Sequence, residues 1–100
     1  MTDAELQTWW PDLGTVVAEL RRIDRAAEAD LLVDAVRAGA TSGEILGGVG
    51  VVLRDHGALR SRLSDSAASA WDAVMADVHG AFPGSSLAEW FARIGRRSAK

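Results

Sequence analysis

Apolar side chains recur at intervals of three and four residues along most of this 100-residue chain. Alternation with a period of two, which is typical of strands, never lasts beyond a few residues. Alanine, leucine, valine and arginine dominate, and runs of β-branched residues are scarce. The pattern therefore predicts an all-α protein in which each helix has one apolar stripe to bury.

The first predicted helix is short and ends at a proline. Thr2 or Asp3 can cap it, and Pro11 interrupts it after DAELQTWW. Pro11 suits the first turn of the next helix, because an N–H group at that position has no intrahelical partner in any case. The apolar stripe that follows comprises Leu13, Val16, Val17, Leu20, Ile23, Ala27, Leu31 and Ala35, and Gly39 closes it.

Residues 11–38 are predicted to form one continuous or merely kinked helix. No glycine or proline lies between Gly14 and Gly39 to end it. The alternative is two helices with a bend near Asp24, which could cap the second one. The apolar positions after Asp24 drift to Leu32 and Val36, off the earlier stripe, and this favours the alternative.

The next helix is predicted over residues 41–56, within the stretch TSGEILGGVGVVLRDHG. Thr41 and Glu44 have the spacing of a capping box, and Gly57 marks the end. The glycines suggest a second hypothesis, a phosphate-binding loop. A Walker-type loop needs a lysine followed by serine or threonine, and a dinucleotide fingerprint needs a preceding strand. The sequence supplies neither feature, so a helix is expected.

Each glycine inside that helix destabilises it by roughly 0.5 to 1 kcal/mol relative to alanine. On a helix, Gly43, Gly47 and Gly50 fall on one face. We expect a neighbouring helix or a bulky tryptophan to approach this face closely. A bound partner or ligand on the bare backbone, or a homodimer seam, is the alternative.

Two further helices are predicted towards the end of the chain. Ser64 or Asp65 can cap the first, whose buried face is expected to contain Ala67, Trp71, Val74, Met75, Val78 and Phe82. The second is short, with Ser86 and Glu89 at a capping-box spacing and an apolar face of Leu87, Trp90, Phe91 and Ile94. Short connections favour a compact antiparallel bundle of four to five helices, one domain over residues 1–97 with a frayed basic tail at 98–100.

Composition and charge reduce the number of function classes that fit the sequence. The chain is 48% apolar and 25% charged, which is typical of a folded domain, and it has no cysteine. Residues 1–80 carry thirteen acids and seven bases, whereas residues 81–100 carry one acid and four bases. This balance disfavours nucleic-acid binding and mildly favours a basic partner. A signal peptide and a membrane span are both absent from the pattern, so a cytoplasmic protein is expected.

Motifs of catalysis or metal binding are missing. His56 and His79 are the only histidines, and each precedes a glycine, where capping or a place at the edge of the core is expected. They form no i,i+4 pair, and the chain has no G-x-S-x-G elbow. We therefore predict no enzyme, no cofactor and no metal site. A small-ligand site built from His56 or His79 and tryptophan is retained as the alternative.

Four tryptophans in 100 residues are the most unusual feature of the composition. Trp71 and Trp90 can join apolar stripes. Trp9 and Trp10 are consecutive and cannot share one face, so at least one is expected near the surface, where tryptophan is enriched in binding sites. The acidic residues predicted to steer a basic partner are Asp24, Glu28, Asp30 and Asp34. A helix-turn-helix over residues 26–53 is disfavoured, because its second helix would offer mainly glycines and Arg54 to the bases.

The stretch TSGEILGGVGVVL followed by a second amphipathic helix resembles small, all-helical bacterial immunity proteins of polymorphic toxin systems. The resemblance covers about a third of the chain and assigns no functional residue. It implies a protein that occludes a basic toxin or enzyme by steric and electrostatic means. We therefore expect a non-enzymatic, protein-binding bundle, with homo-oligomerisation in a structural or adaptor role as an alternative.

Overall fold

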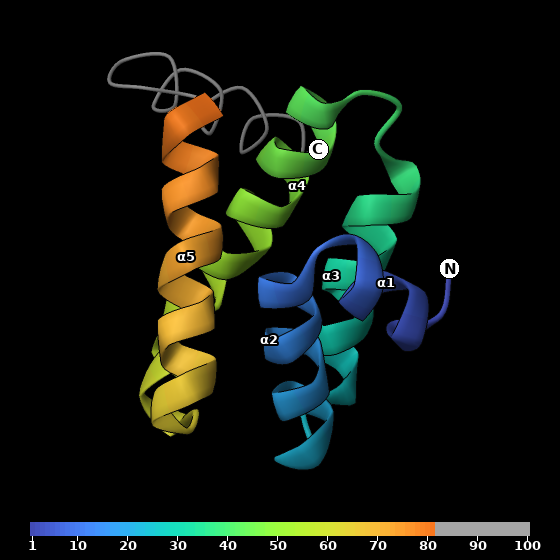
Figure 1. Cartoon of the computed structure of the whole chain (residues 1–100). Coiled ribbons are helices and arrows are strands. Elements are labelled where there is room, and N and C mark those ends of the chain that lie inside the picture. Colours follow the sequence, from blue (N-terminus) through green and yellow to red (C-terminus); the bar gives the residue numbers. More distant parts are fainter. Residues whose placement is uncertain (82–100) are drawn as a thin grey trace, which may run out of the picture.

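The computed structural model describes residues 1–81, and all of the regular structure in that range is helical (Figure 1). In chain order the elements are α1 (Asp3–Trp9), α2 (Pro11–Arg22), α3 (Ala26–Ala38), α4 (Ser42–Asp55), the 3₁₀ helix η1 (Gly57–Arg62) and α5 (Asp65–Ala81). The prediction of an all-α bundle is confirmed. The predicted helix at 86–94, Phe82 and the tail at 98–100 lie outside the described residues.

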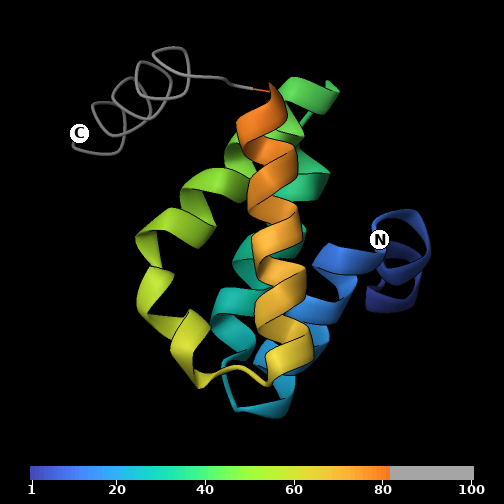
Figure 2. The same ribbon diagram turned by 60° about the vertical axis from the view of Figure 1, so that its left-hand side comes forward.

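The four long helices form a closed antiparallel ring. Each of α2, α3, α4 and α5 runs opposite to the one before it (Figures 1 and 2). α3 packs between α2 and α4, and α5 packs against both α4 and α2, which closes the ring. α1 lies outside the ring and packs on α2. Each long helix therefore turns one stripe towards a shared core.

Within residues 1–81 the buried core is aliphatic, with one large aromatic ring. Trp71, at 5% exposure, is buried among it, as its stripe predicted. Burial of each leucine or valine side chain stabilises the fold by about 1.5 to 3 kcal/mol relative to leaving it exposed. The other buried members are Leu6, Leu13, Val16, Val17, Leu20, Ala29, Leu32, Val33, Val36, Val49, Leu53, Leu63, Ala67, Ala70, Val74 and Val78.

The expectation of one helix over 11–38 is wrong, because the chain breaks at Asp24. Asp24 has a left-handed backbone, with φ of 64°. Its N–H donates to the carbonyl of Arg21 at 3.2 Å, and the N–H of Arg25 donates to the carbonyl of Leu20 at 2.7 Å. This pair of bonds is a Schellman motif, which ends α2 without a glycine. Asp24 therefore terminates α2 and does not cap α3, for which the capping residue is Arg25.

The break also rotates the buried face. Beyond it the predicted stripe fails, since Ala27 and Leu31 are exposed and Ala35 is only half-buried. The buried residues of α3 are Ala29, Leu32, Val33 and Val36. The drift of the apolar positions to Leu32 and Val36 was therefore the true sign of a second helix.

Caps and glycines explain how α4 is placed. Thr41 accepts from the N–H of Glu44 at 3.2 Å, as predicted, while the Glu44 carboxylate accepts from the N–H of Ala40 at 3.1 Å. Gly47 and Gly50 are buried, but Gly43 is exposed. At Gly48 an added Cβ would make an ordinary 3.4 Å contact with the Cβ of Ala35 on α3, and at Gly43 it would meet no neighbouring helix. Gly47 and Gly50 are therefore the two predicted glycines that α4 buries, whereas packing does not require glycine at position 48.

Candidate functional site: a tryptophan groove

A groove of about 370 Å³ lies where three distant parts of the chain meet. We call it the tryptophan groove. The join between α1 and α2, the first turns of α4 and the second half of α5 contribute its walls. Its described lining residues are Trp9, Trp10, Ser42, Ile45, Leu46 and Asp77. Four of the six carry large apolar side chains, so the groove offers an apolar surface with a polar rim.

The two tryptophans are presented differently because a sharp elbow separates them. Trp10 is both the last cap of α1 and the first cap of α2, and Pro11 restarts the helix directly after it. The two rings stand at 89° to one another with centroids 6.2 Å apart. Trp10 is half-buried and packs on the core, while Trp9 is 56% exposed. The prediction that at least one of them reaches the surface is confirmed.

The elbow is fixed by close packing between α1 and α2. Leu6 is fully buried and inserts α1 into the core. Gly14 allows α1 to come so near that a Cβ on Gly14 would lie 2.6 Å from the Cα of Gln7. The side-chain amide of Gln7 donates to the carbonyl of Pro11 at 3.1 Å. Close packing on α2 therefore fixes the position of α1, the helix that carries Trp9.

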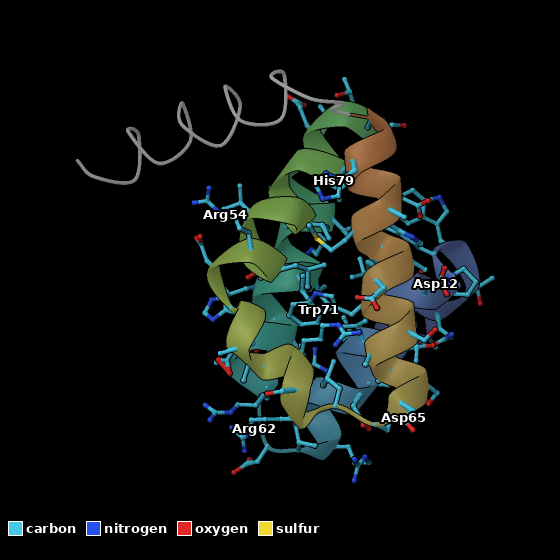
Figure 3. All side chains as sticks on the ribbon, turned by 90° about the vertical axis from the view of Figure 1, so that its left-hand side faces the viewer. Asp12, Arg54, Arg62, Asp65, Trp71 and His79 are labelled. Carbon is cyan, nitrogen blue, oxygen red and sulfur yellow. The ribbon has the colours of Figure 1, made fainter. Side chains whose placement is uncertain are left out.

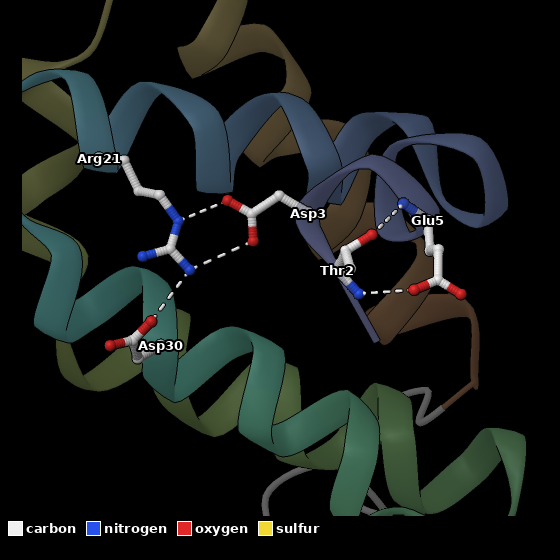
Figure 4. Close-up of polar contacts among 5 residues, drawn as sticks. All are labelled: Thr2, Asp3, Glu5, Arg21 and Asp30. Atoms are coloured by element: carbon white, nitrogen blue, oxygen red, sulfur yellow. Dashed lines mark hydrogen bonds and ion pairs between the residues drawn. The ribbon is translucent and has the colours of Figure 1, made fainter.

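Polar contacts hold the other end of α1 (Figure 4). Nη2 of Arg21 lies 3.2 Å from Oδ1 of Asp3 on α1 and 2.9 Å from Oδ1 of Asp30 on α3. Both carboxylates raise the pKa of Arg21. Thr2 and Glu5 form a capping box at the start of α1, and these hydrogen bonds lower the pKa of Glu5. One arginine thus ties three helices together at the surface.

The opposite wall of the groove depends on Gly39. This residue ends α3 in an extended conformation, and a Cβ there would lie 2.5 Å from Cγ1 of Ile45 and 2.9 Å from its backbone nitrogen. Ile45 is half-buried and packs on the core. Only glycine therefore allows the first turn of α4 to sit close enough to face the tryptophans. Asp77 supplies an exposed carboxylate from α5.

The predicted acidic residues are not gathered beside the tryptophans. Asp24 is exposed just beyond the C-terminal end of α2, whereas Trp10 caps the other end. The twelve residues of this helix separate the two by about 18 Å. Glu28 is half-buried and pairs with Arg25 at 3.8 Å, and Asp30 pairs with Arg21. Asp34 is exposed on α3. Among residues 1–81, the acidic side chain that does reach the groove is Asp77, which was not among those predicted.

The two histidines lie far apart, His56 at the C-terminal end of α4 and His79 on α5, near the start of α4 (Figures 2 and 3). His56 caps the C-terminus of α4, while α5 ends beside the start of α4, and His79 is near that end (Figure 2). Neither lines the tryptophan groove. Among residues 1–81, three or more histidine, aspartate or glutamate side chains nowhere come together as a metal site would require. A site that uses both histidines therefore has no support from the geometry.

Glu19 is a buried charge that sequence reasoning missed. Its side chain is 9% exposed, and its carboxylate accepts from Arg22 and from the backbone N–H of Ser64, the latter at 2.8 Å. These hydrogen bonds, with that of Arg22 the strongest, lower the pKa of Glu19 from 4.5 to about 2. Glu19 joins α2 to the start of α5 and is a structural group distant from the groove.

Comparison with known proteins adds no relative. No protein-family model matches the chain, and no curated protein or solved structure shows significant similarity to it. In the described part of the chain, every helix is too short or too polar to cross a membrane. The tryptophan groove and the charge of the chain are therefore the features that bear on function.

Proposed function

We propose that this protein acts by binding another protein through the tryptophan groove, without catalysing a reaction. The observation that supports this is a largely exposed tryptophan on a packed elbow, set beside a second tryptophan, Ile45 and Leu46. Aromatic anchors held in place before binding lose little conformational entropy when a partner docks. An amphipathic helix is a fitting ligand for such a groove, since its apolar face can lie along the tryptophans.

Charge indicates a basic partner. Residues 1–80 carry thirteen acids and seven bases, and Asp77 stands on the rim of the groove. An acidic surface attracts a basic protein and raises its rate of association. The most concrete form of the proposal is inhibition of a basic toxin or enzyme by occlusion, in the manner of an immunity protein.

The test is affinity capture from the source organism, followed by calorimetry with the purified partner. Trp9→Ala is expected to weaken binding by about 2 kcal/mol or more, roughly thirtyfold in Kd, as for a binding hot spot. Leu31→Ala is the matched control, because Leu31 is a similarly exposed apolar side chain, at 44%, outside the groove. Equal affinity of Trp9→Ala and the native protein would contradict the proposal.

The role of charge is tested separately on the association rate. Asp77→Lys is expected to slow association and to weaken its dependence on salt. Asp55→Lys makes the same charge change at the C-terminal end of α4, away from the groove, and should slow association less. A partner that binds with the same salt dependence in all three proteins would remove the electrostatic part of the proposal.

Self-association is the alternative occupant of the groove. A homodimer would show a mass that depends on protein concentration in light scattering, and Trp9→Ala would shift it to the monomer. That result would replace a foreign partner with a second copy of this chain.

A further inference from the structure

The tryptophan groove contains a carboxylate that no cation of the described chain neutralises. Asp77 is exposed on the rim of the groove, and none of the described lining residues is a lysine, an arginine or a histidine. Within residues 1–81, Asp77 forms no ion pair, whereas arginines pair with Asp3, Glu19, Glu28, Asp30, Asp55 and Asp72. The groove therefore has a negative charge that is available to a ligand.

The two indole rings form a right-angled corner whose faces suit a cation. The rings of Trp9 and Trp10 stand at 89° with centroids 6.2 Å apart, and both line the groove. The face of an indole ring carries partial negative charge, so it attracts a cation that lies within about 6 Å of the ring centroid. Trp9 is largely exposed, so a ligand can reach its ring. Two aromatic walls and a carboxylate in one groove are the chemistry of a cation-binding site.

The first turn of α4 sets the shape of cation that fits. Its N-terminal end at Ser42 carries partial positive charge, which opposes a cation, but the carboxylate of Glu44 in the same turn offsets it. Ile45 and Leu46 form an apolar wall of the groove. Such a wall packs well against the aliphatic stem of a long side chain. A side chain with an aliphatic stem and a cationic head therefore suits the groove better than a compact cation.

We propose that the tryptophan groove binds an arginine side chain of the partner protein, with its guanidinium group stacked on Trp9 and directed towards Asp77. A guanidinium group is planar and weakly hydrated, so it stacks on aromatic faces and can donate two parallel hydrogen bonds to a carboxylate. A lysine ammonium group is compact and strongly hydrated, so it gains less from an open aromatic face. The source of the arginine rests on the proposed function, whereas the preference for a guanidinium group is a property of the groove alone.

This preference is measured with blocked single amino acids. The probe is N-acetyl-arginine amide, and N-acetyl-citrulline amide is its control, because citrulline has nearly the same shape without the charge. Each is titrated into the full chain at constant ionic strength, and the indole N–H signals of Trp9 and Trp10 are followed by NMR. We expect the arginine probe to bind about tenfold more tightly than the citrulline probe, since a cation–π contact and an exposed ion pair each contribute a severalfold effect.

Three variants locate the site. Asp77→Asn should reduce the preference for arginine to about threefold, because the aromatic contact remains. Trp9→Leu should abolish the preference, because leucine keeps an apolar side chain there without an aromatic face, and the signal of Trp10 then reports binding. Asp34→Asn is the control, since it removes an exposed carboxylate of α3 that does not line the groove. It should leave the preference unchanged.

Several results would overturn the proposal. Equal binding of the arginine and citrulline probes would assign a purely apolar ligand to the groove. N-acetyl-lysine amide that binds as tightly as the arginine probe would show that stacking of a planar cation adds nothing. An equal loss of preference in Asp34→Asn and Asp77→Asn would assign the effect to the net charge of the protein. Indole signals that do not shift with either probe would show that the groove holds no such side chain.

These outcomes are separate from those of the partner experiment. If Trp9→Ala loses the partner while arginine and citrulline bind equally, the proposed function stands and this inference fails. If arginine is preferred while Trp9→Ala leaves the affinity for the partner unchanged, the proposed function fails and the preference of the groove for a guanidinium group stands. The two failures are therefore distinguishable.

Discussion

Gly14→Ala tests whether α1, which carries Trp9, packs closely on α2. Glycine to alanine in a helix interior ordinarily stabilises a protein by about 0.5 to 1 kcal/mol. At Gly14 the new Cβ would lie 2.7 Å from Oε1 of Gln7, which can swing away, and 2.6 Å from its Cα, which cannot. Relief requires a shift of α1 as a whole. Overpacking of this kind costs about 1 to 3 kcal/mol.

The backbone contact places the cost in the upper half of that range. After the gain in helix propensity, we expect Gly14→Ala to lower the free energy of unfolding by about 1 to 2 kcal/mol. Gly48→Ala is the matched control, because its Cβ would make an ordinary 3.4 Å contact with Ala35. It should raise the stability by about 0.5 to 1 kcal/mol.

Urea titration and thermal melting measure both effects, since 1 kcal/mol corresponds to about 4 to 8 °C in a domain of this size. Gln7→Ala should fail to rescue Gly14→Ala, because the decisive contact is with the backbone of Gln7. Equal stabilisation by Gly14→Ala and Gly48→Ala would refute the close packing of α1 on α2. It would also remove the physical basis for a fixed Trp9.

Three further predictions concern the break between α2 and α3, the buried carboxylate and the wall of the groove. Asp24→Gly should stabilise the protein by about 0.5 to 1 kcal/mol in urea titration, because glycine adopts the left-handed backbone without strain, and Asp24→Ala should destabilise it. Because the pKa of Glu19 is lowered from 4.5 to about 2, its contribution is complete above pH 4.5 and is lost as the pH falls towards 2. The urea midpoint of Glu19→Gln should accordingly be below that of the native protein near neutral pH and depend less on pH across this window; parallel curves would assign the acid sensitivity to other groups. Gly39→Ala should destabilise the protein by about 1 to 3 kcal/mol, because its Cβ would overlap the backbone of Ile45, and unchanged melting would contradict that packing.

Helices and their caps were predictable from the sequence because they depend on local spacing. The three-and-four spacing located α4 and α5, and Thr2, Thr41 and Ser64 cap their helices as expected. The break at Asp24 was harder to predict. A Schellman motif usually uses glycine, so the aspartate at that position suggested an N-cap for a second helix and not the end of the first. The shift of the apolar stripe was the other signal of the break.

The candidate site could be predicted only in part, because its walls come from distant segments. Trp9 and Trp10 were selected from their adjacency, which prevents both rings from reaching the same face. Ile45, Leu46 and Asp77 join them only once the order of the helices around the ring is known. The ion pairs of the predicted acidic residues were visible only in part from the sequence, because Glu28 pairs with Arg25, three residues away, whereas the partner of Asp30 lies on another helix.

Because α1 carries Trp9, the tryptophan groove exists only while α1 stays folded against α2. α1 buries one large side chain, Leu6, which is worth about 1.5 to 3 kcal/mol, against 5 to 15 kcal/mol for a typical whole domain. Its remaining anchors include the surface ion pairs of Arg21, which salt screens. Amide hydrogen exchange should therefore detect the opening of residues 3–9 well below the global free energy. Higher ionic strength would then lower the fraction of molecules in which Trp9 is positioned to bind, before any ligand is present.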